Sequence, residues 1–170
     1  MTQPTISVAN YFIAKAIDSG AEITPMKLIK LVYIAHGWHL AFRGQPLIGE
    51  AVEAWKFGPV IDSIYQNFKE FKNSQITRQK TYLGPGGQLV VPQVSDADTQ
   101  IFLDRVWVSY GRYNGLQLSA MTHQPDTPWD TIWKKNGGAE MRGAVIPNDL
   151  IEQHYKHLAA TRPANTSSAS

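Results

Sequence analysis

The stretch from Thr24 to Gly44 constrains the fold more than any other part of the chain. Thr24 can cap unpaired backbone N–H groups and Pro25 suits the first position of a helix, so the pair predicts a helix start. The predicted helix runs to about Phe42 and ends near Gly44, because glycine readily adopts the left-handed conformation of a helix end.

The distribution of apolar residues around this helix is unusual. At about 100° per residue, nearly all of it is apolar or aromatic outside one narrow stripe. That stripe contains Lys27, Lys30, Ile34, Gly37 and Ala41. A helix that is apolar over most of its surface is usually the central helix of a bundle. We therefore expect this helix to form the core.

The remaining pattern predicts a mainly helical domain of the α+β class with a small β-hairpin. Apolar residues at helical spacing, with start and stop residues at the ends, indicate further helices. They are expected at 7–19, 59–71, 95–110, 116–123, a short piece from 127, and 148–158. Short apolar runs around the glycine-rich turn 84–87 predict a hairpin over 75–91, and 51–55 is a short strand or an ordered loop. We expect one domain over 1–160 and a flexible tail over 161–170.

Composition excludes several function classes. The 170 residues include no cysteine, so disulfides, thiolate nucleophiles and cysteine-ligated metal sites are excluded. The formal net charge of +2 provides no bulk attraction for nucleic acid. The first residues lack the basic and apolar pattern of a signal peptide, and no apolar run approaches the roughly 20 residues that cross a bilayer. We expect a cytoplasmic protein with no membrane partner.

A metal-dependent hydrolase is one alternative that the residues leave open. His36 and His39 are three residues apart on the core helix, and Glu53 or His123 could complete a ligand set. The HExxH pattern is missing and no acidic cluster accompanies these residues. We favour histidines that are hydrogen-bonded in the core. No catalytic constellation is evident, so we predict no enzyme activity, no metal and no cofactor.

A nucleic-acid-binding regulator is the second alternative. Five cations between residues 56 and 80 are interleaved with aromatic residues, a mixture that can bind phosphates and stack on bases. The cations are Lys56, Lys69, Lys72, Arg78 and Lys80. A solvated face above an aromatic core is the more frequent explanation, and we do not expect nucleic acid as the partner.

Five tryptophans point instead towards protein binding, because tryptophan is enriched at the energetic centres of interfaces. The stripe of Lys27, Lys30 and Gly37 is expected to be exposed, with Trp55 and Phe57 beside it and the 75–91 hairpin as a neighbour. These residues form the predicted partner-binding face.

Several blocks of sequence resemble one known family. The string 26–41 (MKLIKLVYIAHGWHLA) resembles the hallmark helix of the Panacea domain, which occurs in SocA-like antitoxins and in phage-associated GepA-like proteins. The blocks ANYF at 9–12, EAWKFGPV at 53–60, LS and TH within 118–123, and PW at 128–129 follow in the family's order. The resemblance covers roughly residues 6–158.

The resemblance implies a mostly helical domain and an antitoxin that neutralises a toxin encoded beside it by direct binding, without catalysis. A second behaviour in the family is delivery of the toxin to a ClpXP-type protease, and phage association is also implied. The family-motif residues would line a small polar pocket or hold the fold, and we favour the structural role. They are Tyr33, His36, Trp38, Glu53, Gly58, Pro59, Thr122, His123 and Trp129. The partner-binding residues remain Lys27, Lys30, Trp55 and Phe57.

Overall fold

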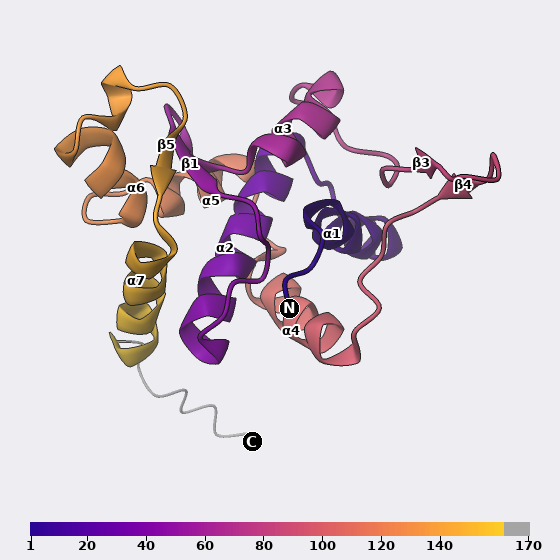
Figure 1. The fold of residues 1–170 in the computed structure, drawn as a ribbon, viewed down its shortest axis with the longest axis horizontal. Coiled ribbons are helices and arrows are strands. Elements are labelled where there is room, and N and C mark those ends of the chain that lie inside the picture. The colour runs from indigo at the N-terminus through magenta and orange to yellow at the C-terminus, as the bar shows by residue number, and fades with distance from the viewer. Residues whose placement is uncertain (162–170) are drawn as a thin grey trace.

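The predicted core helix, α2 (Pro25–Arg43), lies at the centre of the fold (Figure 1). The structure is a computed structural model and describes residues 1–161. The Thr24 hydroxyl accepts a hydrogen bond from Lys27 N, and Gly44 ends the helix with φ of 66°. The caps therefore act as the sequence predicts.

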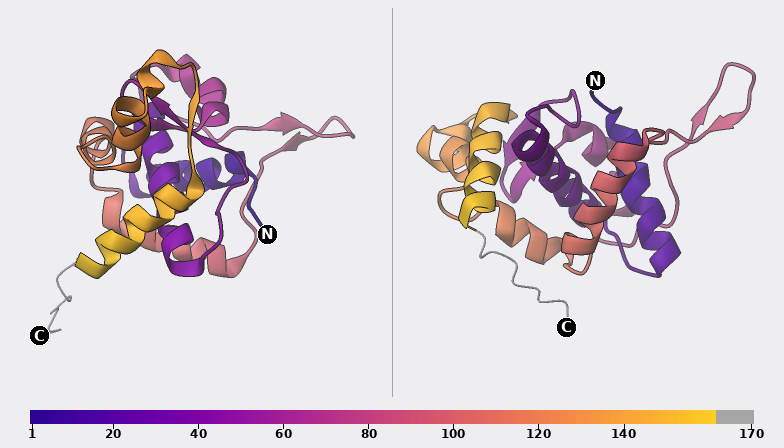
Figure 2. Two further views of the ribbon diagram at one scale, coloured as in Figure 1. Left: turned by 60° about the vertical axis from the view of Figure 1, so that its left-hand side comes forward. Right: turned by 90° about the horizontal axis from the view of Figure 1, so that it is seen from below.

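The other helices surround α2, so the prediction of a mainly helical fold is confirmed (Figure 2). They are α1 (Thr5–Ser19), α3 (Asp62–Phe68), α4 (Ala97–Tyr110), α5 (Gly115–Thr122), α6 (Pro128–Asp130) and α7 (Asn148–Thr161). Short 3₁₀ segments occupy Lys69–Phe71 and Gly138–Glu140, and a π-helical turn occupies Thr131–Lys135. The predicted tail over 161–170 lies outside the described residues except for Thr161, which ends α7.

A three-stranded antiparallel sheet covers one end of the helices. Its strands are β1 (Val52–Trp55), β2 (Gly58–Val60) and β5 (Ala144–Ile146), in the order β2-β1-β5. The register places Ala54 opposite Pro59 on one side and opposite Ala144 on the other. The sequence pattern leaves 51–55 open between a strand and an ordered loop, and it does not predict β5.

The predicted helix start at Pro59 is wrong. Pro59 lies inside β2, and the third helix begins only at Asp62. Gly58 has φ of +117°, so the chain turns there and returns as a strand along β1. A proline suits an edge strand because its missing N–H leaves no ladder partner unsatisfied, and β2 is such an edge.

The predicted hairpin is confirmed as β3 (Tyr82–Leu83) and β4 (Leu89–Val90), with much shorter strands than the 75–91 segment. In all views it projects away from the helical body (Figures 1 and 2).

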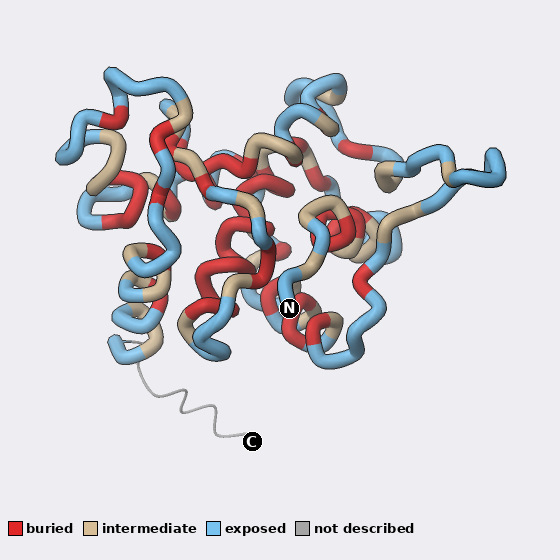
Figure 3. The backbone as a smooth tube through the Cα atoms, viewed as in Figure 1, coloured by how far each residue is buried: buried red, intermediate tan, exposed pale blue. Residues whose placement is uncertain are grey.

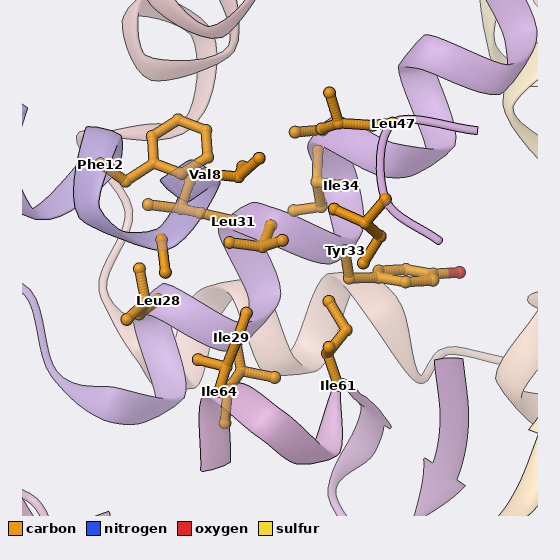
Figure 4. Close-up of a cluster of buried hydrophobic side chains, with 14 of the residues drawn as sticks. Val8, Phe12, Leu28, Ile29, Leu31, Tyr33, Ile34, Leu47, Ile61 and Ile64 are labelled. Carbon is orange, nitrogen blue, oxygen red and sulfur yellow. The ribbon is translucent and has the colours of Figure 1, made fainter. Parts of the chain in front are cut away.

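The hydrophobic core gathers around α2, where the buried backbone concentrates (Figure 3). Phe12 from α1, Leu28 and Leu31 from α2, and Ile61 and Ile64 from the β2–α3 segment form one cluster (Figure 4). Burying each such side chain stabilises the fold by about 1.5–3 kcal/mol relative to exposure. Among residues 1–161, no helix combines the length and apolar character needed to cross a lipid bilayer.

Candidate functional site

The structure overturns the expectation of an exposed lysine stripe on α2. Lys27 and Lys30 are only 5% and 2% exposed. Lys27 Nζ donates a hydrogen bond to Gly111 O at 2.6 Å and lies 5.2 Å from the centroid of the Trp107 ring. Burial lowers the pKa of Lys27, with Glu22 acting in the opposite direction. The stripe is a packing surface and offers no face to a partner.

Lys30 is buried against the turn that joins β1 to β2. Its Nζ donates to Pro59 O at 2.8 Å. A β-carbon at Gly58 would lie 2.9 Å from this Nζ, so both the contact and the positive φ require glycine there. Burial lowers the pKa of Lys30 to about 7.

Two further side chains hold the same turn. Trp129 Nε1 donates to Trp55 O at 2.6 Å, and Ser119 Oγ donates to Phe57 O at 2.7 Å. Together with Lys30 on Pro59 O, three buried donors from α6, α5 and α2 bind three alternate carbonyls of residues 55–59. The turn is therefore fixed by hydrogen bonds to three separate helices.

The fixed turn presents an aromatic side chain to solvent. Phe57 is 60% exposed, and Lys56 Nζ lies 5.5 Å from the centroid of its ring. An exposed aromatic residue on immobilised backbone loses little conformational freedom when a partner covers it. Phe57 is therefore an exposed aromatic side chain on a backbone held by buried donors.

A cleft of about 610 Å³ opens beside the turn, between β1, α3 and residues 133–143. The rings of Trp55 and Tyr65 meet edge to face with centroids 5.0 Å apart, and Trp133 lines the opposite part. Trp55 Nε1 donates to Glu53 Oε2 at 2.9 Å, which fixes the indole at the rim. Trp55 and Glu53 are among the site residues predicted from the sequence, whereas Tyr65 and Trp133 are not, although both are aromatic residues on predicted helices.

Comparison with known proteins identifies a family that includes the residues of this turn. The profile described as "Antitoxin SocA-like, Panacea domain" matches residues 28–130. The chain is 32% identical over 152 residues to "Antitoxin SocA" of Caulobacter vibrioides (strain NA1000 / CB15N), which covers 88% of this chain and 81% of that protein. The chain belongs to the SocA-like Panacea family. No solved structure matches it.

Membership of the Panacea family supports an antitoxin role for the chain, which implies a toxin partner in general. It also indicates a regulator that acts without catalysis. The matched residues 28–130 include most of α2, the fixed turn, α3 and α5. The matched residues therefore include Trp55 and Tyr65 at the cleft and all three donors that hold the turn.

The metal alternative does not fit the geometry. His36 Nε2 lies 2.9 Å from Asn148 Oδ1, and its Nδ1 accepts a bond from Ile48 N. His39 Nδ1 donates to Gln45 O at 2.6 Å, and Glu53 bonds to an indole instead of an imidazole. Burial lowers the pKa of both histidines. Within the described residues no three His, Asp or Glu side chains converge as a metal site would require.

Most other motif residues pack within the Panacea fold. Trp38 Nε1 donates to the Tyr110 hydroxyl at 2.8 Å, and the rings of Tyr33 and Trp38 meet Tyr155 edge to face. The ring of His123 lies edge to face with Trp129, with centroids 5.3 Å apart. The Thr122 hydroxyl donates to Leu118 O at 2.9 Å. These contacts join α2 to α4 and α7, and the end of α5 to α6.

Two of the aromatic rings that are interleaved with the basic residues of the 56–80 segment already have contacts within the protein. Phe68 is buried in the core, and the Arg78 guanidinium lies over Phe71 at 5.8 Å from its centroid. Lys56 lies over Phe57 at the fixed turn, at the other end of α3 from Arg78. The stacking that a nucleic-acid-binding surface needs is therefore not provided by Phe68.

Proposed function

We propose that this chain neutralises a toxin by direct protein–protein binding, through the face that contains Phe57 and the Trp55–Tyr65 cleft. The observation that carries the proposal is the fixed turn: buried donors hold three of its carbonyls while Phe57 stays exposed. Residues that bind from a prearranged position lose less entropy on association.

The size of the face suits a complex of ordinary dimensions. A stable interface buries about 800 Å² per partner and concentrates its energy in a few aromatic or cationic anchors. Phe57 and the exposed part of Tyr65 are such anchors, and Lys56 adds a cation above the Phe57 ring. This mode of neutralisation needs no catalytic group and takes place in the cytoplasm, where the toxin is made.

Replacing Phe57 with alanine tests the face. The probe is the purified product of the reading frame next to this gene, titrated against the wild type and Phe57→Ala by calorimetry. We expect the dissociation constant to rise about 20-fold, roughly 2 kcal/mol, because the anchor contact is lost. Phe57 is exposed, so the free energy of unfolding should change by less than about 0.5 kcal/mol.

Phe42→Ala is the matched control, because Phe42 is also exposed and lies at the far end of α2, stacked on Trp38. Its dissociation constant should stay within about twofold of the wild type. Equal weakening by the two substitutions would contradict the proposed face. Delivery to a protease is a different outcome: toxin levels in cells would then fall in the presence of this chain, whereas direct binding predicts that the toxin persists as a complex.

A further inference from the structure

The β3–β4 hairpin, with its supporting segments 72–81 and 91–95, forms an arm that projects from the body (Figures 1 and 2). Its register places Tyr82 opposite Val90 and Leu83 opposite Leu89. Directly opposed residues point to the same face of a ribbon, so the two leucines form one face and Tyr82 with Val90 the other. The leucines are 74% and 72% exposed.

The root of the arm is hydrogen-bonded to the helical body, although the strands of the arm are exposed to solvent. Asn10 on α1 is fully buried, and its Nδ2 donates to Lys80 O and Pro92 O at 3.0 Å each. Asn10 Oδ1 accepts from Lys80 N at 2.8 Å, and Asn10 O accepts from Gln79 Nε2 at 3.1 Å. One buried asparagine thus binds both segments that lead into the arm. Its direction is fixed by the body, while its leucine face stays in solvent.

An exposed leucine pair on a two-stranded ribbon is unfavourable unless something covers it. Two-stranded hairpins are only marginally stable in water, and apolar groups gathered on a surface commonly mark a binding site. The helical body leaves the leucine pair in solvent, as the exposure of Leu83 and Leu89 shows. On the other face of the ribbon, the Tyr82 hydroxyl lies 3.5 Å from Asn67 Oδ1 on α3.

The charges around the arm indicate the chemistry of its occupant. Lys72, Arg78 and Lys80 precede the strands, and no acidic residue occurs between Glu70 and Asp96. None of these three cations forms an ion pair with any residue in the described range 1–161. A surface that is apolar at its tip and positive at its root complements an apolar groove with a negative rim.

We infer that the arm inserts its Leu83–Leu89 face into an apolar groove of the toxin, with acidic side chains of the toxin meeting the cations at its root. The inference rests on the proposed function and adds a second contact to it. α3 connects the two contacts: Tyr65 packs on Trp55, and Asn67 lies against Tyr82. Because α3 lies between the sheet and the arm (Figure 1), a partner lying across α3 would meet both contacts.

Two other occupants fit the arm less well. A second copy of this chain would bring two positive roots together, which is unfavourable for like charges. Nucleic acid would need cations along the strands, but residues 81–91 contain none and the strand side chains are apolar. Both remain measurable outcomes of the test.

The test compares Leu83→Ser/Leu89→Ser with the wild type in titrations against the purified product of the adjacent reading frame. We expect the dissociation constant to rise about 30-fold, because two buried leucine contacts are lost. Ile101→Ser/Val108→Ser is the matched control: both residues are exposed on α4, which lies below α1 in Figure 1, whereas α3 lies above it. It should bind within about twofold of the wild type. The charge reversal Lys72→Glu/Arg78→Glu should weaken binding more at low salt than at high salt, because salt screens the interaction between charges.

The outcomes distinguish a failure of the inference about the arm from a failure of the proposed function. If the leucine variant binds with an unchanged dissociation constant while Phe57→Ala binds more weakly, the inference about the arm is wrong and the proposed function stands. Absence of any wild-type complex would overturn both. If the leucine variant instead loses self-association in sedimentation, or loses binding to duplex DNA from the region upstream of its gene, a second copy or nucleic acid is the occupant and the inference is wrong. Thermal unfolding of each variant should match the wild type, because the strand residues lie outside the core.

Discussion

Gly37→Ala is expected to destabilise the fold by about 2–3 kcal/mol, even though alanine is the better helix former. A β-carbon at Gly37 would lie 2.3 Å from Cε2 and 2.4 Å from Cδ2 of Tyr155 on α7. The tyrosine ring cannot move aside, because it is buried and packs edge to face against Tyr33 and Trp38. The strain exceeds the roughly 1 kcal/mol gained from helix propensity.

Urea unfolding followed by circular dichroism measures this effect. The double variant Gly37→Ala/Tyr155→Leu is the control, because a smaller side chain leaves room for the new methyl group. It should be more stable than the sum of the two single substitutions predicts, a sign that the two positions are in contact. A Gly37→Ala protein as stable as the wild type would show that α7 does not pack on α2 in this way.

Lys30→Met is expected to abolish a rise in stability between pH 6.5 and 9.5. Burial lowers the folded-state pKa of Lys30 to about 7, whereas the unfolded chain titrates near 10.5. Below pH 7 the lysine is protonated in both states, so the full penalty of burying a charge applies. Between pH 7 and 10.5 the unfolded chain binds more protons, so the free energy of unfolding increases with pH. The increase from pH 6.5 to 9.5 amounts to about 3 kcal/mol.

The measurement is urea unfolding of wild type and Lys30→Met at both pH values. The difference between the two proteins isolates Lys30, because other groups cancel. Among these are Tyr33 and Tyr155, whose raised pKa values oppose the trend at alkaline pH. Lys69→Met, at an exposed position, should keep the wild-type pH profile. A constant difference between wild type and Lys30→Met across this range would mean that Lys30 is not buried against Pro59.

The central helix could be predicted because its signals are local. Thr24 and Pro25 define its start and Gly44 its end, and each acts through hydrogen bonds or backbone angles of its immediate neighbours. The hairpin around residues 84–87 could be predicted for the same reason, since turn residues specify it. The family resemblance likewise depended on short blocks of sequence, and the profile match confirms it.

The burial of Lys27 and Lys30 could not be predicted from the helix alone. Lysine is rarely buried, so its position on the one polar stripe of the helix predicts exposure. The carbonyls of Gly111 and Pro59 that accept their hydrogen bonds lie 84 and 29 residues away in sequence. Gly37 on the same stripe was the available signal, since a glycine inside a helix often marks the close approach of another element.

The sheet was missed for a related reason. β5 has three residues, and its pairing with β1 spans about 90 positions of sequence, so no local pattern reveals it. The local sequence predicts a helix start at Pro59 as well as it does at Pro25. The strand forms instead because Gly58 reverses the chain and Lys30 binds the proline carbonyl. The fixed turn at Phe57 therefore emerged only from the folded structure.

The most direct test of the proposed function uses cells that express the adjacent reading frame alone or together with this chain. The account predicts growth arrest with the adjacent product alone and recovery with the wild-type chain. It also predicts a complex of the two proteins that can be purified, and poorer recovery with Phe57→Ala than with Phe42→Ala. Recovery without any complex, or equal recovery with both variants, would contradict neutralisation through the face that contains Phe57.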